Sequence, residues 1–215
     1  MKKAQMVYRY FAEGVLNDRK RHFTLRGIAR ELALSPNTVS LAAMQLAKVG
    51  AVTKYNGYFG VTSLEKLLVF WSVVRNLDHD IKYRTYSSLG IAEIEKRMPA
   101  EVAYTCYSGY VALFGNDVSD YDKIYVYATE SGLKEVMRRF PEMELQGKPG
   151  YSNILVLKAD PVMEIMIEEH TLRKAAAPLT QIYVDLWNNK DWFAYEFLKK
   201  LRQRIEDKYA KAILQ

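Results

Sequence analysis

The stretch SPNTVSLAAMQLAKVGAVTKYNGYFGVT, residues 35–62, decides the fold of the first third of the chain. Ser35 is a good helix N-cap, and Pro36 follows it at the first helical position, where its missing N–H costs nothing. Gly50 is placed to end the helix that these two residues begin. The β-branched and aromatic run after it is interrupted by an Asn-Gly pair, which favours a two-residue type I′ turn between strands. The stretch therefore predicts one helix followed by a β-hairpin.

Two further helices precede this stretch. Apolar residues at a spacing of three to four predict a helix over 3–16, and Thr24 caps a second predicted helix, LRGIARELA, over 25–33. The short turn that follows has Ala33 where many such turns have glycine. Because alanine pays about 1 kcal/mol in a left-handed conformation, this position leaves room for another turn geometry. The order of helices and hairpin predicts a winged helix-turn-helix domain over 1–62.

The charge of the chain is unevenly distributed. Residues 1–64 contain ten Lys and Arg against three Asp and Glu, a net charge of +7, whereas residues 65–215 contain 21 against 22. All of the basic excess therefore lies in the segment that resembles a DNA-binding domain. This is the electrostatic pattern expected of a nucleic-acid-binding module, and double-stranded DNA is the partner that we expect.

Candidate DNA contacts follow from the usual docking of such a domain, in which the third helix enters the major groove. Asn37 could pair with adenine, whereas the hydroxyls near it suit phosphates. Leu41, Met44 and Gln45 stand where such helices usually carry Arg or Lys, so phosphate attraction must come from the surrounding basic residues. The expected DNA-binding residues are Arg26, Arg30, Pro36, Asn37, Thr38, Ser40, Lys48, Lys54, Tyr55 and Tyr58.

The rest of the chain predicts a connector helix over 63–80 and then an α/β domain over 81–215 with a small mixed sheet. The connector is apolar on so broad a face that we expect it to pack on another domain or on a second copy of the chain, which leaves a homodimer open. The stretch APLTQIYVDLWN is ambiguous between strand and helix. A long amphipathic helix is expected at the C-terminus, with these residues facing inward: Trp192, Tyr195, Leu198, Leu201, Ile205 and Tyr209. The fold class is therefore α+β.

Two other functions of the second domain stay open. Asp120 and Asp122 resemble the paired carboxylates with which nucleotidyltransferases hold Mg²⁺, but the Gly-Ser pair and the spacing of that motif are missing. The second alternative is a small-molecule sensor with an aromatic pocket. The tyrosines that would line such a pocket are Tyr104, Tyr107, Tyr110, Tyr125 and Tyr127, for which core packing is the simpler interpretation.

No other chemistry is indicated. The three histidines, His22, His79 and His170, have no second ligand at metal-binding spacing, and the single cysteine, Cys106, lies in an apolar run. We therefore expect no metal, no cofactor and no enzymatic activity. The longest apolar run, extended to eight residues by one serine, is far shorter than the ~20 residues that span a bilayer, and no signal peptide is visible. These features predict a cytoplasmic protein without a membrane partner.

Taken over nearly its full length, the chain resembles the AbiEi family of type IV antitoxins, in a form found in archaea as well as bacteria. Besides the N-terminal domain, the resemblance rests on YSGYVALFG (107–115), DKIYVYAT (122–129), NILVLKADP (153–161) and APLTQIYVDLWN (177–188). The resemblance implies a transcriptional repressor that binds repeats in its own promoter. It also implies that the C-terminal domain counteracts a nucleotidyltransferase-like toxin. The uncharged third helix departs from what such a repressor usually carries.

Overall fold

The computed structural model describes residues 2–169 and 175–214, with side chains up to residue 210. Over these residues the protein is an α+β protein with eleven helices, a two-stranded hairpin, a five-stranded mixed sheet and a long C-terminal helix. None of the helices in this described part is long and apolar enough to cross a bilayer. The mixed sheet and the C-terminal helix confirm the fold class predicted from the sequence.

Contacts divide the chain into two compact units. Unit 1 consists of Met1–Arg75, Pro178–Asn188 and Lys199–Gln215, and unit 2 consists of Asn76–Ala177 and Asn189–Leu198. Each unit therefore combines segments that are far apart in the chain, whereas each predicted domain is one continuous stretch.

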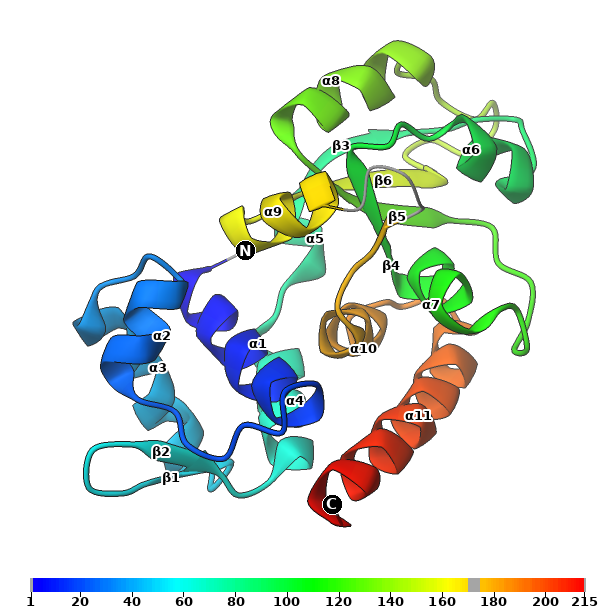
Figure 1. Cartoon of the computed structure of the whole chain (residues 1–215). Helices are drawn as coiled ribbons and strands as arrows, with labels where there is room; N and C mark the ends of the chain where they lie inside the picture. The colour runs from blue at the N-terminus through cyan, green and yellow to red at the C-terminus, as the bar shows by residue number, and fades with distance from the viewer. Residues whose placement is uncertain (1, 170–174, 215) are drawn as a thin grey trace. The chain divides into compact units, whose positions relative to one another are not determined.

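Unit 1 begins with three helices and a hairpin, which Figure 1 shows in blue and cyan. Thr24 and Ser35 cap the second and third helices, as predicted, because their hydroxyls accept the N–H groups of Gly27 and Thr38. The third helix ends before Gly50, whose φ is +69°. The bounds are α1 Lys3–Leu16, α2 Leu25–Glu31, α3 Pro36–Lys48, β1 Val52–Lys54 and β2 Phe59–Val61.

The structure settles the backbone geometry of the two turns in this region. Ala33 has a φ of +50°, so the turn between α2 and α3 keeps a left-handed residue although no glycine is present. In the hairpin turn only Gly57 has a positive φ (+86°), whereas a type I′ turn requires one at Asn56 as well. Beyond the paired residues Lys54 and Phe59, the N–H of Tyr55 donates to the carbonyl oxygen of Tyr58 at 2.8 Å, which leaves two residues, Asn56 and Gly57, in the turn. The prediction was therefore right about the length of the turn and wrong about its type.

The predicted connector helix is two helices, α4 (Leu64–Val74) and α5 (Leu77–Asp80). The helix stops because Arg75 takes an extended conformation and Asn76 caps the next helix through the N–H of His79. The ambiguous segment forms another helix of unit 1, α10 (Leu179–Trp187), which packs on α1 and α4.

A buried polar network holds α10 in place within unit 1. Arg75 donates to Asp185 at 3.1 Å, and both side chains are at most 1% exposed. Gln181 donates to the same Asp185 oxygen at 3.0 Å and accepts from Arg9 of α1 at 3.4 Å. Gln5 of α1 accepts from Arg75 at 3.5 Å. The network explains why the segment PLTQIYVDLWN carries Gln and Asp on an otherwise apolar helix.

The C-terminal helix α11 (Ala194–Leu214) differs from the prediction in which face is buried. Trp192 and Tyr195, which were expected inside, are 80% and 67% exposed. Phe193 and Phe197 are buried instead, and Leu201 and Ile205 continue the buried stripe as predicted. An aromatic-rich start, DWFAYEF, fits more than one helical stripe, so the sequence does not fix which one is buried.

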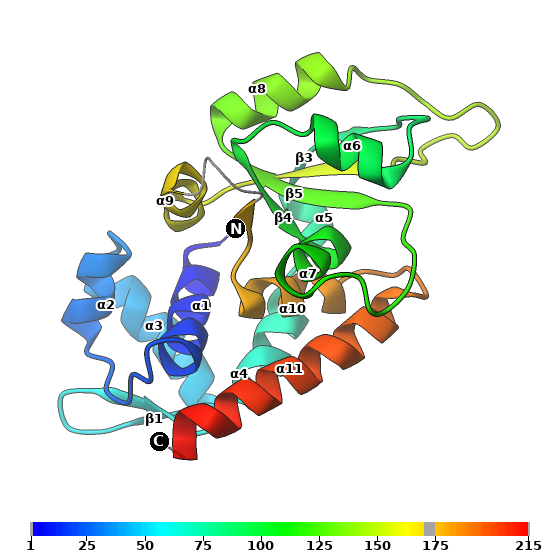
Figure 2. The ribbon, with the colours of Figure 1, turned by 45° about the vertical axis from the view of Figure 1, so that its right-hand side comes forward.

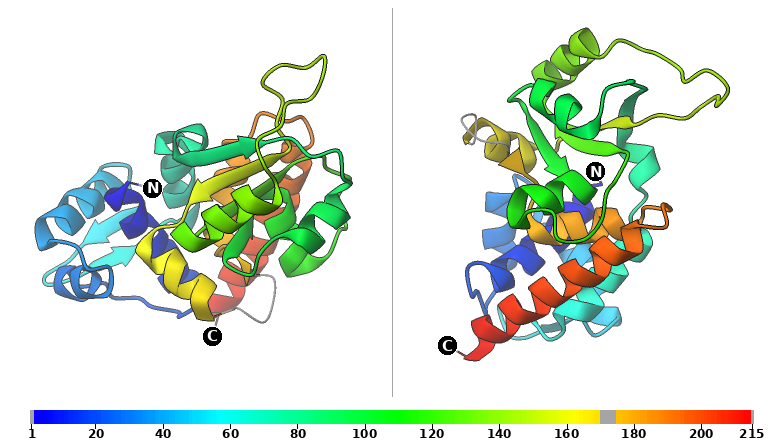
Figure 3. Two further views of the ribbon diagram at one scale, coloured as in Figure 1. Left: turned by 90° about the horizontal axis from the view of Figure 1, so that it is seen from above. Right: turned by 90° about the vertical axis from the view of Figure 1, so that its right-hand side faces the viewer.

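Unit 2 is built around the mixed sheet, whose strand order is β3-β6-β5-β4-β7. The parallel pair β5 and β6 is joined through α8, while β3 and β4 run antiparallel to their neighbours β6 and β5. Figures 1 to 3 show α6 and α8 on one face and α7 on the other. The bounds are β3 Ile81–Thr85, α6 Ile91–Arg97, β4 Val102–Thr105, α7 Cys106–Phe114, β5 Ile124–Ala128, α8 Glu130–Arg139, β6 Ile154–Lys158, α9 Pro161–Glu169 and β7 Ala175–Ala176.

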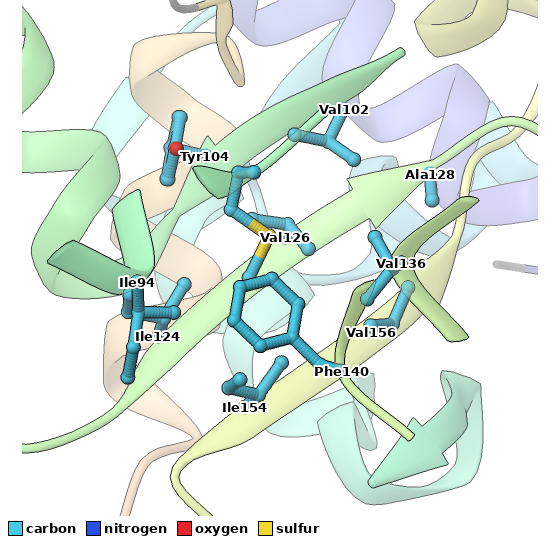
Figure 4. Packing of buried hydrophobic residues seen from close by; sticks show 11 residues of the cluster. Ile94, Val102, Tyr104, Ile124, Val126, Ala128, Val136, Phe140, Ile154 and Val156 are labelled. Atoms are coloured by element: carbon cyan, nitrogen blue, oxygen red, sulfur yellow. The ribbon is translucent and has the colours of Figure 1, made fainter. Parts of the chain in front are cut away.

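The core beneath α6 and α8 is formed by side chains from the three central strands, as Figure 4 shows. Val126, Ile154 and Val156 are fully buried, and Ile94 and Val136 cover them from the two helices. All five residues of β5 are buried, which matches its continuous apolar sequence, because a strand covered on both faces does not alternate with polar residues.

Candidate nucleic-acid interface

The helix α3 is fixed to unit 1 by one apolar face and presents the opposite face to solvent. Val39, Ala42, Ala43 and Leu46 are at most 1% exposed and pack in the core with α1 and α2. The spacing of these residues follows the helical repeat, so the side chains between them must point away from the core. Burial of one face therefore determines which residues of α3 are available to a partner.

The exposed face of α3 starts polar, continues apolar and ends basic. Asn37 and Lys48 are exposed near its two ends, while Leu41 and Met44 between them are 61% and 40% exposed. Gln45 accepts a hydrogen bond from the hydroxyl of Tyr8 on α1, and burial raises the pKa of that tyrosine to about 12. Asn37, Leu41, Met44 and Lys48 recur at helical spacing, so they form one stripe, which we call the α3 stripe.

The hydroxyls near the start of α3 are partly used within the helix. Ser35 accepts from the backbone of Thr38 at 3.2 Å, and the two hydroxyl oxygens lie 2.8 Å apart. Thr38 and Ser40 are half-buried, whereas Pro36 is exposed at the first position of the helix. Of the polar candidates at this end, Asn37 is therefore the best placed to reach a partner.

The four predicted cations lie on α3 and on the elements next to it, and no carboxylate among the described residues pairs with them. Arg26 and Arg30 are exposed on α2, Lys48 ends α3, and Lys54 ends β1. In the described residues none of these four makes an ion pair with a carboxylate. Their charge is thus available to an anionic partner, which is what phosphate contacts require.

The hairpin brings a pair of tyrosines beside the segment that joins α1 to α2. Phe23 of that segment and Phe59 of β2 exchange backbone hydrogen bonds of 2.9 and 2.8 Å. Tyr55 and Tyr58 stack with ring centroids 4.8 Å apart and planes at 17°, and Tyr55 is 45% exposed. His22 and Tyr58 make a T-shaped contact with ring centroids 4.4 Å apart.

A hollow of about 450 Å³ lies between this segment and the hairpin, and Tyr209 of α11 also lines it. The basic segment 17–22 is visible in the sequence, but its position beside the tyrosines follows from the Phe23–Phe59 pairing, which no local signal predicts. Arg19 and Arg21 line the hollow, and both are exposed. Sequence reasoning therefore missed this feature.

Lys20 of the same segment is engaged within unit 1. Its ammonium group donates to the hydroxyl of Tyr10 and lies 3.6 Å from Glu31. Burial lowers the pKa of Lys20, but the hydrogen bond to Tyr10 and the charge of Glu31 outweigh that effect and raise it. Lys20 thus keeps its charge but does not present it freely.

The residues of the alternative functions lie in unit 2. Asp120 and Asp122 are exposed in the loop before β5, not on the strand, and Asp122 accepts a hydrogen bond of 2.8 Å from Tyr151. In the described residues no group of three His, Cys, Asp or Glu side chains could hold a metal, and His170 lies outside them. Cys106 is buried.

The five tyrosines proposed for a sensor pocket are all at most 7% exposed, so they belong to the core of unit 2. Hydroxyls of this group are hydrogen-bonded within the unit: Tyr104 donates to the backbone of Glu95 at 3.0 Å, Tyr107 to Asp191 at 3.2 Å and Tyr110 to Asp117 at 2.7 Å. Burial also raises the pKa of Tyr104, Tyr107 and Tyr125. Packing and hydrogen bonding account for these residues.

Comparison of the chain with models of protein families, with curated proteins and with solved structures found no match.

Proposed function

We propose that this protein is a DNA-binding transcriptional regulator, whose first three helices and hairpin act as a winged helix-turn-helix. The observation that carries the proposal is the α3 stripe together with the four unpaired cations around it. The opposite face of α3 is buried in the core of unit 1, and the net charge of residues 1–64 is +7. In this proposal Asn37 contacts bases, and Arg26, Arg30, Lys48 and Lys54 contact phosphates.

The proposal separates residues that read sequence from residues that only attract DNA. Asn37→Ala is expected to lower the ratio of specific to random DNA affinity, because an asparagine–adenine pair is worth about 1–3 kcal/mol of discrimination. Lys54→Ala is expected to weaken binding to all DNA alike. Fluorescence anisotropy with the upstream DNA of the gene and with a shuffled duplex measures both. If Asn37→Ala left the ratio unchanged, α3 would not be reading through this residue.

We further propose that the chain is the autoregulating antitoxin of a type IV toxin–antitoxin pair. The support is the resemblance of residues 107–115, 122–129, 153–161 and 177–188 to the AbiEi family. In this proposal the partner is a nucleotidyltransferase-like toxin, and the protein itself is not an enzyme. The test is to express the neighbouring genes, one at a time, with and without this chain. Relief of a growth defect supports the proposal, and a neighbourhood without a toxic gene would contradict it.

A further inference from the structure

We propose that the hollow between segment 17–22 and the hairpin binds a nucleotide, with the phosphate on Arg19 and Arg21 and the base against Tyr55 and Tyr58. The inference goes beyond the proposed reading of DNA by α3, because no residue of α3 lines the hollow. It rests on the shape, the charge and the aromatic wall of the hollow.

The size of the hollow is that of a ligand site, and a glycine is among the residues that line it. Its volume of about 450 Å³ lies within the ~300–1,000 Å³ of typical small-molecule sites. Gly60 of β2 lines the hollow, and a Cβ at this position would lie 3.1 Å from the Tyr55 ring and 3.6 Å from the carbonyl oxygen of Arg21. A side chain at this position would therefore push the two walls apart.

The charge of the hollow favours an anion. Its lining contains Arg19, Lys20 and Arg21 and, among the described side chains, no Asp or Glu. Lys20 is engaged by Tyr10 and Glu31, but over the part of the chain that is described neither arginine makes an ion pair. Two free guanidinium groups suit a phosphate, because their planar donor array can bind two oxygens at once.

The aromatic wall favours a ring beside that phosphate. Tyr55 keeps 45% of its surface exposed although it stacks on Tyr58, and His22, which also lines the hollow, makes a T-shaped contact with Tyr58. Every nucleobase has a π-face, so such a wall accepts a base without hydrogen bonds that depend on its identity. A basic wall facing stacked tyrosines matches a nucleotide better than a bare anion.

The position of the third wall is set by α11. Lys208 donates to the side chain of Asn17, and Tyr209 next to it lines the hollow. Residues from three separate stretches of unit 1 therefore meet at this site. The nucleotide could be free in solution or be one residue of a DNA strand, and the same side chains would recognise both.

Isothermal titration calorimetry of the full chain tests the proposal with two probes, adenosine 5′-monophosphate and an unphosphorylated dA hexanucleotide. Arg19→Ala/Arg21→Ala should weaken binding by tenfold or more, since a hydrogen bond to a charged group is worth ~1.5–3 kcal/mol. Tyr55→Ala should weaken it about 5- to 150-fold, which is the ~1–3 kcal/mol of one base stack. Tyr55→Phe keeps the ring and should bind like the wild type.

Lys199→Ala/Lys200→Ala is the matched control, because it removes the same charge from exposed positions of α11 outside the hollow. Binding of the monophosphate identifies a free nucleotide as the ligand, and binding of the hexanucleotide alone identifies a DNA strand. Absence of binding to both probes would overturn the proposal, and so would equal losses in the control and the arginine variant. Asn37→Ala should leave both titrations unchanged, so failure here is distinguishable from failure of DNA reading by α3.

Discussion

Replacement of Asp185 by alanine should destabilise unit 1 strongly. The carboxylate is fully buried, accepts from Arg75 at 3.1 Å, and accepts from Gln181 at 3.0 Å. Its removal leaves a buried guanidinium without the anion that it faces, and breaking such a pair typically costs about 3–5 kcal/mol. Because a protein of this size is stable by only ~5–15 kcal/mol, this one substitution should remove a large part of the stability.

Urea unfolding followed by tryptophan fluorescence measures the effect, since Trp71 and Trp187 both lie in unit 1. The matched comparison is the double variant Arg75→Met/Asp185→Leu, which replaces the ion pair with apolar side chains. We expect it to be more stable than Asp185→Ala, because an apolar replacement of a buried pair is often neutral or stabilising. A loss below about 1 kcal/mol for Asp185→Ala, or an equal loss in both variants, would refute the reasoning.

Three further predictions concern unit 2 and the α3 stripe. Gly132→Ala should destabilise unit 2 by about 1–3 kcal/mol in thermal unfolding, since the new Cβ would lie 2.2 Å from the carbonyl oxygen of Glu101. Gly90→Ala is the control and should be nearly neutral, because open space surrounds that position. The buried tyrosines of unit 2 have raised pKa values, so the stability that they contribute is complete below pH ~10 and falls as the pH rises further. Tyrosinate absorbance at 295 nm should therefore appear together with the loss of near-ultraviolet circular dichroism. Ionisation of these tyrosines without unfolding would contradict this prediction. If Leu41 contacts a thymine methyl, replacing that thymine by uracil should weaken binding about fourfold, the ~0.8 kcal/mol of one buried methyl group, and Leu41→Ala should abolish the difference.

The sequence predicted the elements whose signals are local. Ser35, Thr24 and Gly50 act as caps and stops through their own hydrogen bonds and backbone preferences, so the helices that they bound are visible without tertiary information. The hairpin is visible for the same reason, although Asn56 does not take the positive φ that its turn type required. Local chemistry fixed the order of the elements in the first 62 residues.

What the sequence could not reveal depends on contacts between distant segments. The buried network around Arg75 includes a partner 110 residues away, Asp185. The side of α11 that is buried follows from what packs on it, which is why Tyr195 was wrongly expected inside. The hollow depends on Phe23 pairing with Phe59. The DNA-binding residues stay a prediction, which rests on local signals because they lie on one helix, its neighbour and the hairpin.

The central claim is that unit 1 binds specific DNA through the α3 stripe, and a gel-shift titration with the upstream DNA of the gene at two salt concentrations tests it most directly. Each phosphate that is neutralised adds about −0.9 to the slope of log affinity against log salt, so contacts from Arg26, Arg30, Lys48 and Lys54 predict a slope near −3.6 per chain. Lys54→Ala should make this slope shallower by about 0.9, and the wild type should prefer the upstream DNA over a shuffled duplex. Equal affinity for both duplexes, or a slope near zero, would contradict the account.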